Sequence, residues 1–221
     1  MTEAEWLACE EPRPMLEFLQ GKASERKLRL FLIACARLEW DRMTDPALRR
    51  AVETAERYVE GHASAQELHE THTALYPTGE DRGLDPRARA CGVSYDVYIS
   101  LLGLAISCGF ASRGLRQIER MNNWNNGTRL TGKRQPVLLR DIVAPFLRPF
   151  PTADTWGAWN NGAASPLAQT IYDERSFDRL PILGDALEDA GCADADLLTH
   201  LRGPGPHVRG CWALDRILGK K

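Results

Sequence analysis

The sequence has no apolar run long enough to span a membrane. Its longest, Leu28 to Leu38, is interrupted by Arg29 and Arg37, whereas a spanning helix needs about 20 apolar residues. The first fourteen residues are acidic and lack the basic-then-apolar order of a signal peptide. Six cysteines among 221 residues are too few for a disulfide framework. We therefore expect a soluble, cytoplasmic protein with no membrane partner.

Catalytic motifs are also missing from the sequence. It contains no HExxH, P-loop, GxSxG or GxGxxG pattern. Two helical spacings could place acid–base groups on one face, namely Asp185 with Glu188 and Asp189, and His69 with His72. Acidic helix faces are usually solvated, however, so we predict neither an enzyme nor a cofactor.

No segment alternates apolar and polar residues with the period of a β-strand, and the patterned segments have the period of a helix. The clearest is residues 24–38, where Leu28, Phe31, Leu32, Cys35 and Leu38 recur at helical spacing. We expect this to be the most buried helix. The prediction is an all-α fold of about nine to eleven helices.

Residues that favour the ends of helices occur at many positions along the chain. Thr2 with Glu5 and Ser64 with Glu67 match the capping box, and further helix starts are expected at Ser24, Asp45-Pro46, Asp85-Pro86, Ser94, Pro136, Ser165-Pro166, Asp178, Asp194 and Pro206. Gly61, Gly191 and Gly203 are expected to end helices.

An Asn-, Trp- and Pro-rich stretch over residues 122–164 interrupts the helical pattern. It is a possible sub-boundary between N-terminal helices in 1–121 and C-terminal helices in 165–221. Since about 60 residues alone form a marginal core, we predict one compact α-helical domain over residues 1–221.

Two end segments resemble a known family. Residues 3–31 have the sequence EAEWLACEEPRPMLEFLQGKASERKLRLF and resemble the opening of a paralogous bacterial family expanded in planctomycete genomes. Residues 167–220 have the sequence LAQTIYDERSFDRLPILGDALEDAGCADADLLTHLRGPGPHVRGCWALDRILGK and are similar to the closing segment of this family. Within them, residues 180–196 are distantly similar to the short repeat-companion domain of the same genomes. The resemblance covers about 40% of the chain; residues 77–165 depart from it. It implies a bacterial, intracellular, all-α protein and no catalytic residues.

Four potential zinc ligands lie near the C-terminus: Cys192, His200, His207 and Cys211. If a helix begins at Pro206, His207 and Cys211 share one of its faces, as a tetrahedral site could use. The spacing from Cys192 to His200 matches no zinc knuckle, and no C-x-x-C is present. The alternative is that both cysteines are small buried core residues.

The turn Arg202-Gly-Pro-Gly-Pro-His-Val-Arg209 is a candidate anion site. A helix beginning at Pro206 would offer free backbone N–H groups beside Arg202, His207 and Arg209. It would also lower the pKa of His207. In the alternative interpretation the turn is structural and its arginines pair with acidic helix faces.

Residues 113–148 carry eight basic and two acidic side chains, in a chain of net charge −2. This stretch could bind nucleic acid, with Trp124 stacking on a base. The chain lacks a domain-wide basic footprint, so a solvated face is the favoured interpretation. The basic residues that would make the patch are Arg113, Arg116, Arg120, Arg129, Lys133 and Arg134.

Three tryptophans, Trp124, Trp156 and Trp159, fall in segments expected to be loops. They either plug the core or anchor a protein partner, because Trp is common at interface hot spots. Together these features favour a non-catalytic intracellular interaction or regulatory module with an unidentified protein partner. A zinc-stabilised domain and an anion- or nucleic-acid-binding protein remain the alternatives.

Overall fold

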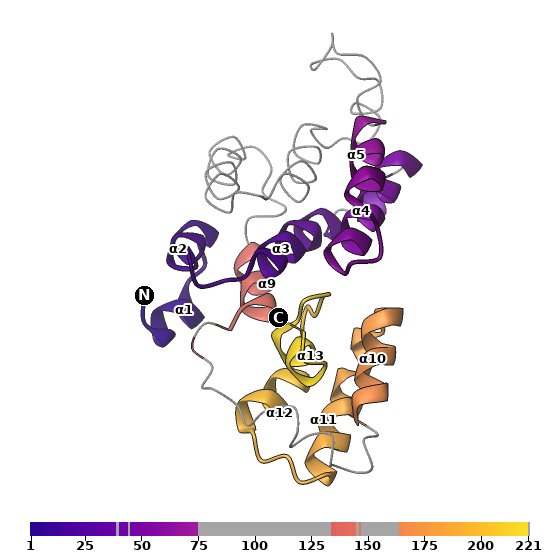
Figure 1. The fold of residues 1–221 in the computed structure, drawn as a ribbon. Coiled ribbons are helices and arrows are strands. Elements are labelled where there is room, and N and C mark those ends of the chain that lie inside the picture. Colours follow the sequence, from indigo (N-terminus) through magenta and orange to yellow (C-terminus); the bar gives the residue numbers. More distant parts are fainter. Residues whose placement is uncertain (39, 44, 75–133, 145, 147–163, 221) are drawn as a thin grey trace. The chain divides into compact units, whose positions relative to one another are not determined.

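The structure, a computed structural model, describes residues 1–38, 40–43, 45–74, 134–144, 146 and 164–220 (Figure 1). These residues form ten α-helices and two short 3-10 helices and no strand, which confirms the all-α prediction for the described part of the chain. None of the described helices is both long and apolar enough to cross a membrane.

The chain divides into two compact units, Met1–Pro136 and Val137–Lys221. The division falls inside the 122–164 stretch that the sequence marks as a possible boundary. It lies after Pro136, so the C-terminal unit contains most of a helix that precedes residue 165.

The described part of the first unit contains α1 (Glu3–Ala8), α2 (Pro12–Phe18), α3 (Glu25–Arg37), α4 (Pro46–Val59) and α5 (Ala65–Thr73), with a 3-10 turn at Trp40–Arg42. Helix α3 packs against α4, and α4 packs against α5. Eight of the thirteen residues of α3 are buried, as its nearly all-round apolar pattern predicts.

Side-chain caps start these helices where the sequence places them. Thr2 and Glu5 form a reciprocal capping box at α1, the Ser24 hydroxyl accepts from the Lys27 amide, and the Asp45 carboxylate accepts from the Ala47 amide. At α5 the Ser64 hydroxyl accepts from the Glu67 amide at 3.1 Å. These four caps confirm the sequence prediction.

Two ion pairs join α3 to α4. The Arg37 guanidinium makes a bidentate contact to Glu56 at 3.0 and 2.8 Å, and Arg26 lies 2.8 Å from Glu60. Both carboxylates are nearly buried.

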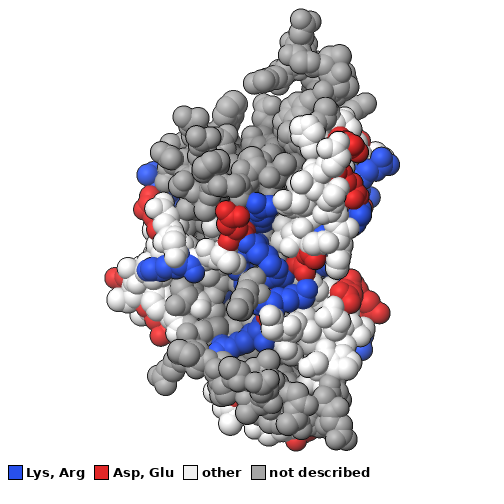
Figure 2. Space-filling view, in the orientation of Figure 1, with Lys and Arg blue, Asp and Glu red and all other residues white. Residues whose placement is uncertain are grey.

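On the surface of α4 and α5, acidic and basic side chains are interspersed (Figure 2), as in the Arg57–Glu67 pair at 2.8 Å.

The C-terminal unit contains α9 (Gln135–Ile142, whose first two residues precede the division), α10 (Ala164–Glu174), α11 (Leu180–Asp189), α12 (Ala195–Leu201) and α13 (Trp212–Ile217), with a 3-10 turn at Phe177–Arg179. Helix α10 packs against α11 and α13, and α12 packs against α11 and α13. Their shared core is almost entirely aliphatic, with Tyr172 as its largest fully buried residue.

Two predicted helix starts in this unit are wrong. Asp178 lies inside the 3-10 turn, and α11 begins two residues later, after Arg179. No helix begins at Pro206: residues 203–211 form an irregular segment with a cis Gly205–Pro206 peptide, and α13 begins only at Trp212. Gly205 and Gly210 have φ of +74° and +88°, a left-handed conformation that interrupts a helix.

The predicted cap at Asp194 is confirmed, and it gives a first prediction. Its carboxylate accepts from the Leu197 amide at 2.9 Å at the start of α12. Loss of such a cap costs about 1 kcal/mol. We expect Asp194→Ala to speed amide hydrogen exchange in α12 about fivefold, measured by mass spectrometry of the full chain, with no change in α3. Unchanged exchange in α12 would contradict this role.

Candidate metal centre

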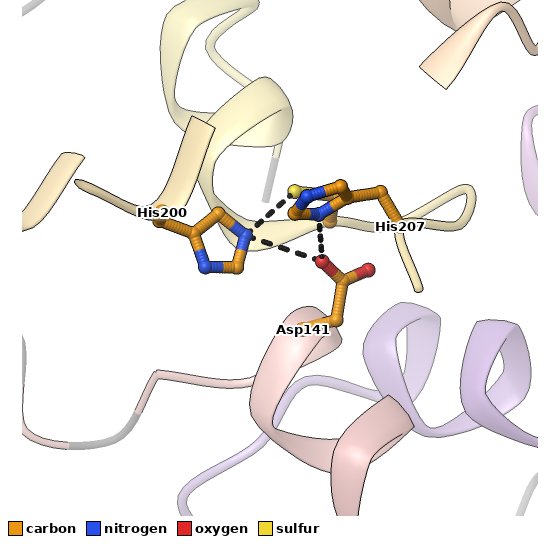
Figure 3. A group of neighbouring side chains, drawn as sticks. Asp141, His200 and His207 are labelled. Carbon is orange, nitrogen blue, oxygen red and sulfur yellow. Dashed lines mark hydrogen bonds and ion pairs between the residues drawn. The ribbon is translucent and has the colours of Figure 1, made fainter. Parts of the chain in front are cut away.

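Four potential metal ligands converge in the C-terminal unit: Asp141, His200, His207 and Cys211. One donor atom from each lies within 4.8 Å of all the others. They come from three places in the chain, since Asp141 is on α9, His200 is on α12, and the other two lie in the segment before α13 (Figure 3).

Asp141 is the hub of this cluster. Its Oδ1 accepts from His207 Nδ1 at 2.7 Å and lies 3.1 Å from His200 Nε2. Its Oδ2 accepts from the backbone amide of Val208 at 3.0 Å. The carboxylate is therefore buried with partners on both oxygens, which offset its desolvation.

The turn that follows α12 brings His207 to this carboxylate. The ring of His207 has Asp141 on one nitrogen and the carbonyl of Gly203 at 3.4 Å on the other. Both neighbours are acceptors, so both ring nitrogens can donate. Burial by itself would lower the pKa of His207, but the hydrogen bond to Asp141 and its charge outweigh burial and raise the pKa above its usual range.

Cys211 completes the group from the N-cap position of α13. Its Sγ lies 3.2 Å from His200 Nε2. Complete burial and the Asp141 charge raise the pKa of the thiol well above its usual range, while hydrogen bonding from the amides of Leu214 and Ala213 acts in the opposite direction. The sulfur is therefore a neutral thiol unless a cation joins the cluster.

The structure brings together three of the four ligands expected from the sequence and replaces the fourth. Cys192 is buried but does not belong to the group; burial raises the pKa of its thiol. Asp141 takes its place. The expectation that His207 and Cys211 share a helix face is wrong, because both lie before the first residue of α13.

Sequence reasoning missed Asp141, although a signal for it was present. It is the one carboxylate of α9 and lies among Leu138, Leu139 and Ile142, all fully buried. A charged residue within a buried apolar segment needs a partner. The pattern shows that Asp141 needs one, but it does not say that the partners lie 59 to 70 positions further along.

The anion-site candidates do not converge on free backbone amides. Arg202 contacts the carboxylates of Asp185 and Glu188, and these hydrogen bonds raise its pKa. Arg209 donates to the carbonyl of Asp173 at 3.2 Å and lies over the Tyr172 ring. The expected lowering of the His207 pKa is wrong, because Asp141 rather than a helix N-terminus faces its ring.

The other predicted site residues are largely outside the described residues. This holds for Trp124, Trp156, Trp159, Arg113, Arg116, Arg120, Arg129 and Lys133. Arg134 is described and exposed. Asp185 and Glu188, considered as acid–base groups, pair with Arg202 instead.

The Asp141–His207 pair gives a pH prediction for metal-free protein. Burial would raise the pKa of Asp141, but its hydrogen bonds to His200 and His207 lower it. Its stabilising contribution is therefore present above the unfolded pKa of about 4 and is lost as pH falls through the lower folded value. The contribution of His207, whose pKa is raised, is present below about 6.5 and is lost as pH rises through the folded value.

In chelator, the C-terminal unit should accordingly be most stable between about pH 4 and 6.5. Urea unfolding across pH, followed by hydrogen exchange in α10–α13, measures this. His207→Gln should flatten the alkaline side of the profile. A wild-type profile that rises steadily from pH 6 to 9 would contradict the pairing.

Comparison with protein-family models, with curated proteins and with solved structures finds no match to this chain. The function is therefore argued from the cluster itself.

Proposed function

We propose that the C-terminal unit is a metal-binding module that holds one zinc ion through Asp141, His200, His207 and Cys211. The observation that carries the proposal is the convergence of these four donors within 4.8 Å of one another. The proposed role is structural: the ion ties α9 to the segment that precedes α13.

The ligand types select the metal. One sulfur, two imidazole nitrogens and one carboxylate oxygen are typical zinc ligands, whereas Mg²⁺ and Ca²⁺ take six or more oxygens. Zinc–ligand bonds of about 2.0–2.3 Å place tetrahedral ligand atoms about 3.4 Å apart. The contacts of 2.7, 3.1 and 3.2 Å are shorter than this and the widest separation in the group, up to 4.8 Å, is longer, so some ligand atoms would move apart and others closer together around an ion.

The charges of the cluster also suit a divalent cation. Without metal, and at a pH below the raised pKa of His207, a protonated His207 balances the Asp141 carboxylate, and Cys211 is a neutral thiol. With zinc, a carboxylate and a thiolate balance the two positive charges, and two protons leave. The cluster is neutral in both states, so zinc uptake places no net charge in the buried site.

Two ligands already have outer partners that a bound ion would keep. The carbonyl of Gly203 can accept the Nε2 proton of His207 while Nδ1 binds metal, and the Val208 amide holds Asp141 Oδ2 while Oδ1 binds. Such partners orient ligands, and their loss typically costs 10- to 100-fold in metal affinity.

Four protein ligands fill a tetrahedral zinc ion and leave no position for water or substrate, as in structural sites. This supports a non-catalytic module. The ion would link residues 66 positions apart in the sequence, Asp141 and His207. A protein partner remains a prediction that rests on tryptophans outside the described residues.

The test is zinc binding by the full chain. We expect native mass spectrometry to show one zinc ion per chain, and cobalt-loaded protein to show the strong visible absorption of a tetrahedral ion with a cysteine ligand. Cys211→Ser should remove the sulfur-to-cobalt charge-transfer band. Asp141→Asn and His207→Gln should each weaken zinc binding by more than about 100-fold, since even outer partners contribute 10- to 100-fold.

Matched controls come from the same chain. Cys192→Ser changes a buried cysteine outside the group, and His69→Gln changes an exposed histidine on α5. Both variants should bind zinc as the wild type does. A wild-type chain that carries no zinc after purification without chelator and binds none in titration would overturn the proposal.

A further inference from the structure

The ring of His200 has an unusual neighbour. Trp212, the first residue of α13, directs its indole Nε1 at His200 Nδ1 at 3.1 Å. The two ring centroids are 4.6 Å apart. Trp212 is partly buried and packs against the core of the C-terminal unit.

This contact determines where the His200 proton lies. An indole N–H can only donate, so the Nδ1 atom of His200 must accept with its lone pair. A neutral His200 therefore carries its proton on Nε2. That nitrogen lies 3.1 Å from Asp141 Oδ1 and 3.2 Å from Cys211 Sγ, and both of these atoms can accept the Nε2 proton. The neighbours of both ring nitrogens therefore favour the same tautomer.

Metal binding requires the opposite tautomer. The donor atom that faces the cluster is Nε2, and it can bind an ion only through a lone pair. The proton would then lie on Nδ1, where it would point at the indole N–H. Two donors in that position repel, and a ligating histidine normally gives its other proton to an acceptor.

We propose that Trp212 is a positioning residue that holds His200 in the Nε2–H tautomer without metal and must give up this hydrogen bond when zinc binds. The inference rests on the proposed function. His207 has no such conflict, since its second nitrogen faces the carbonyl of Gly203. Asp141, His207 and Cys211 therefore capture the ion first, and His200 joins last as the indole moves away.

Nitrogen-15 NMR of histidines reads the tautomer directly. In the full chain, with signals assigned through His200→Gln, we expect His200 to be Nε2–H in chelator and Nδ1–H after addition of one equivalent of zinc. The indole N–H signal of Trp212 should shift in the same titration. The tautomer itself is measured in the wild-type protein, and His200→Gln serves only to identify the His200 signal.

Trp212→Phe supplies a second readout. It keeps an aromatic ring in the core and removes the competing donor. Because a net hydrogen bond contributes about 0.5–1.5 kcal/mol, zinc affinity should rise about two- to tenfold. The control is Trp6→Phe, which changes a buried tryptophan in the other unit and should leave the affinity unchanged.

The contrary outcomes are distinct. An Nδ1–H tautomer in metal-free protein would overturn the holding role of Trp212. Persistence of Nε2–H in protein that carries zinc, or weaker zinc binding by Trp212→Phe, would overturn the release and leave the zinc site itself standing. A chain that binds no zinc overturns the proposed function and the release together.

Discussion

Removal of zinc is expected to lower the melting temperature of the C-terminal unit by at least about 15 °C. A ligand at a thousand times its dissociation constant stabilises the folded state by about 4 kcal/mol. For a unit of this size, each kcal/mol shifts the melting temperature by about 4–8 °C. We expect a large effect because the proposed ion would join segments that are far apart in the sequence and have no comparable link in the unfolded chain.

Calorimetry of the full chain with zinc and with chelator measures this shift, and hydrogen exchange in α10–α13 assigns it to the C-terminal unit. Helices α3 and α4 should be unaffected. In Cys211→Ser, chelator should change the melting temperature by only a few degrees. Equal melting of the wild type in zinc and in chelator would show that the cluster is a hydrogen-bonded network without a metal.

Asp141→Asn should destabilise the C-terminal unit in chelator by about 3 kcal/mol. The carboxylate is buried, and the substitution removes the negative charge that faces His207 Nδ1 at 2.7 Å and accepts from the Val208 amide at 3.0 Å. Cys211→Ser should cost only about 1 kcal/mol under the same conditions, because a neutral thiol is replaced by a hydroxyl that can bond to the same neighbours.

With zinc present, the two substitutions should become similarly severe, since each removes one of four ligands. Urea unfolding with and without chelator therefore separates the role of the ion pair from the role of the metal. If the two variants lose the same unfolding free energy in chelator, the Asp141–His207 pairing is contradicted. If each variant loses as much unfolding free energy in chelator as it does in zinc, the metal site is contradicted.

Local chemistry predicted the helices well. Thr2, Ser24, Asp45, Ser64 and Asp194 each cap a helix as expected, because a cap depends on atoms within three residues of each other. The apolar period of α3 likewise predicted its burial. Helix caps and apolar periodicity can be predicted from the sequence because they depend only on residues that are close together in it.

The segment 203–211 shows where local chemistry is insufficient. Pro206 is compatible with a helix start, and the sequence predicted one there. In the folded chain, Asp141 of α9 accepts from the Val208 amide and holds the His207 ring. These contacts come from 66 and 67 positions away and stabilise an irregular backbone that no neighbouring residue specifies.

Three of the four members of the candidate site could be predicted from residue type, and Asp141 could not. His200, His207 and Cys211 stood out by residue type, but Cys192 has the same type and lies outside the group. Which of these residues share a site depends on packing among α11, α12 and α13. The hydrogen bond from the Trp212 indole to His200 could not be predicted from the spacing of these residues either.

By itself the sequence determined the all-α class of the described residues, the N-terminal caps of five described helices and the residue types able to bind a metal, because these depend on side chains and backbone within a few residues. Only the tertiary structure decided that Asp141 is the fourth member of the cluster and Cys192 is not. The reason is geometric: ligand atoms must meet within a few ångströms, and long-range packing of separate helices sets those distances.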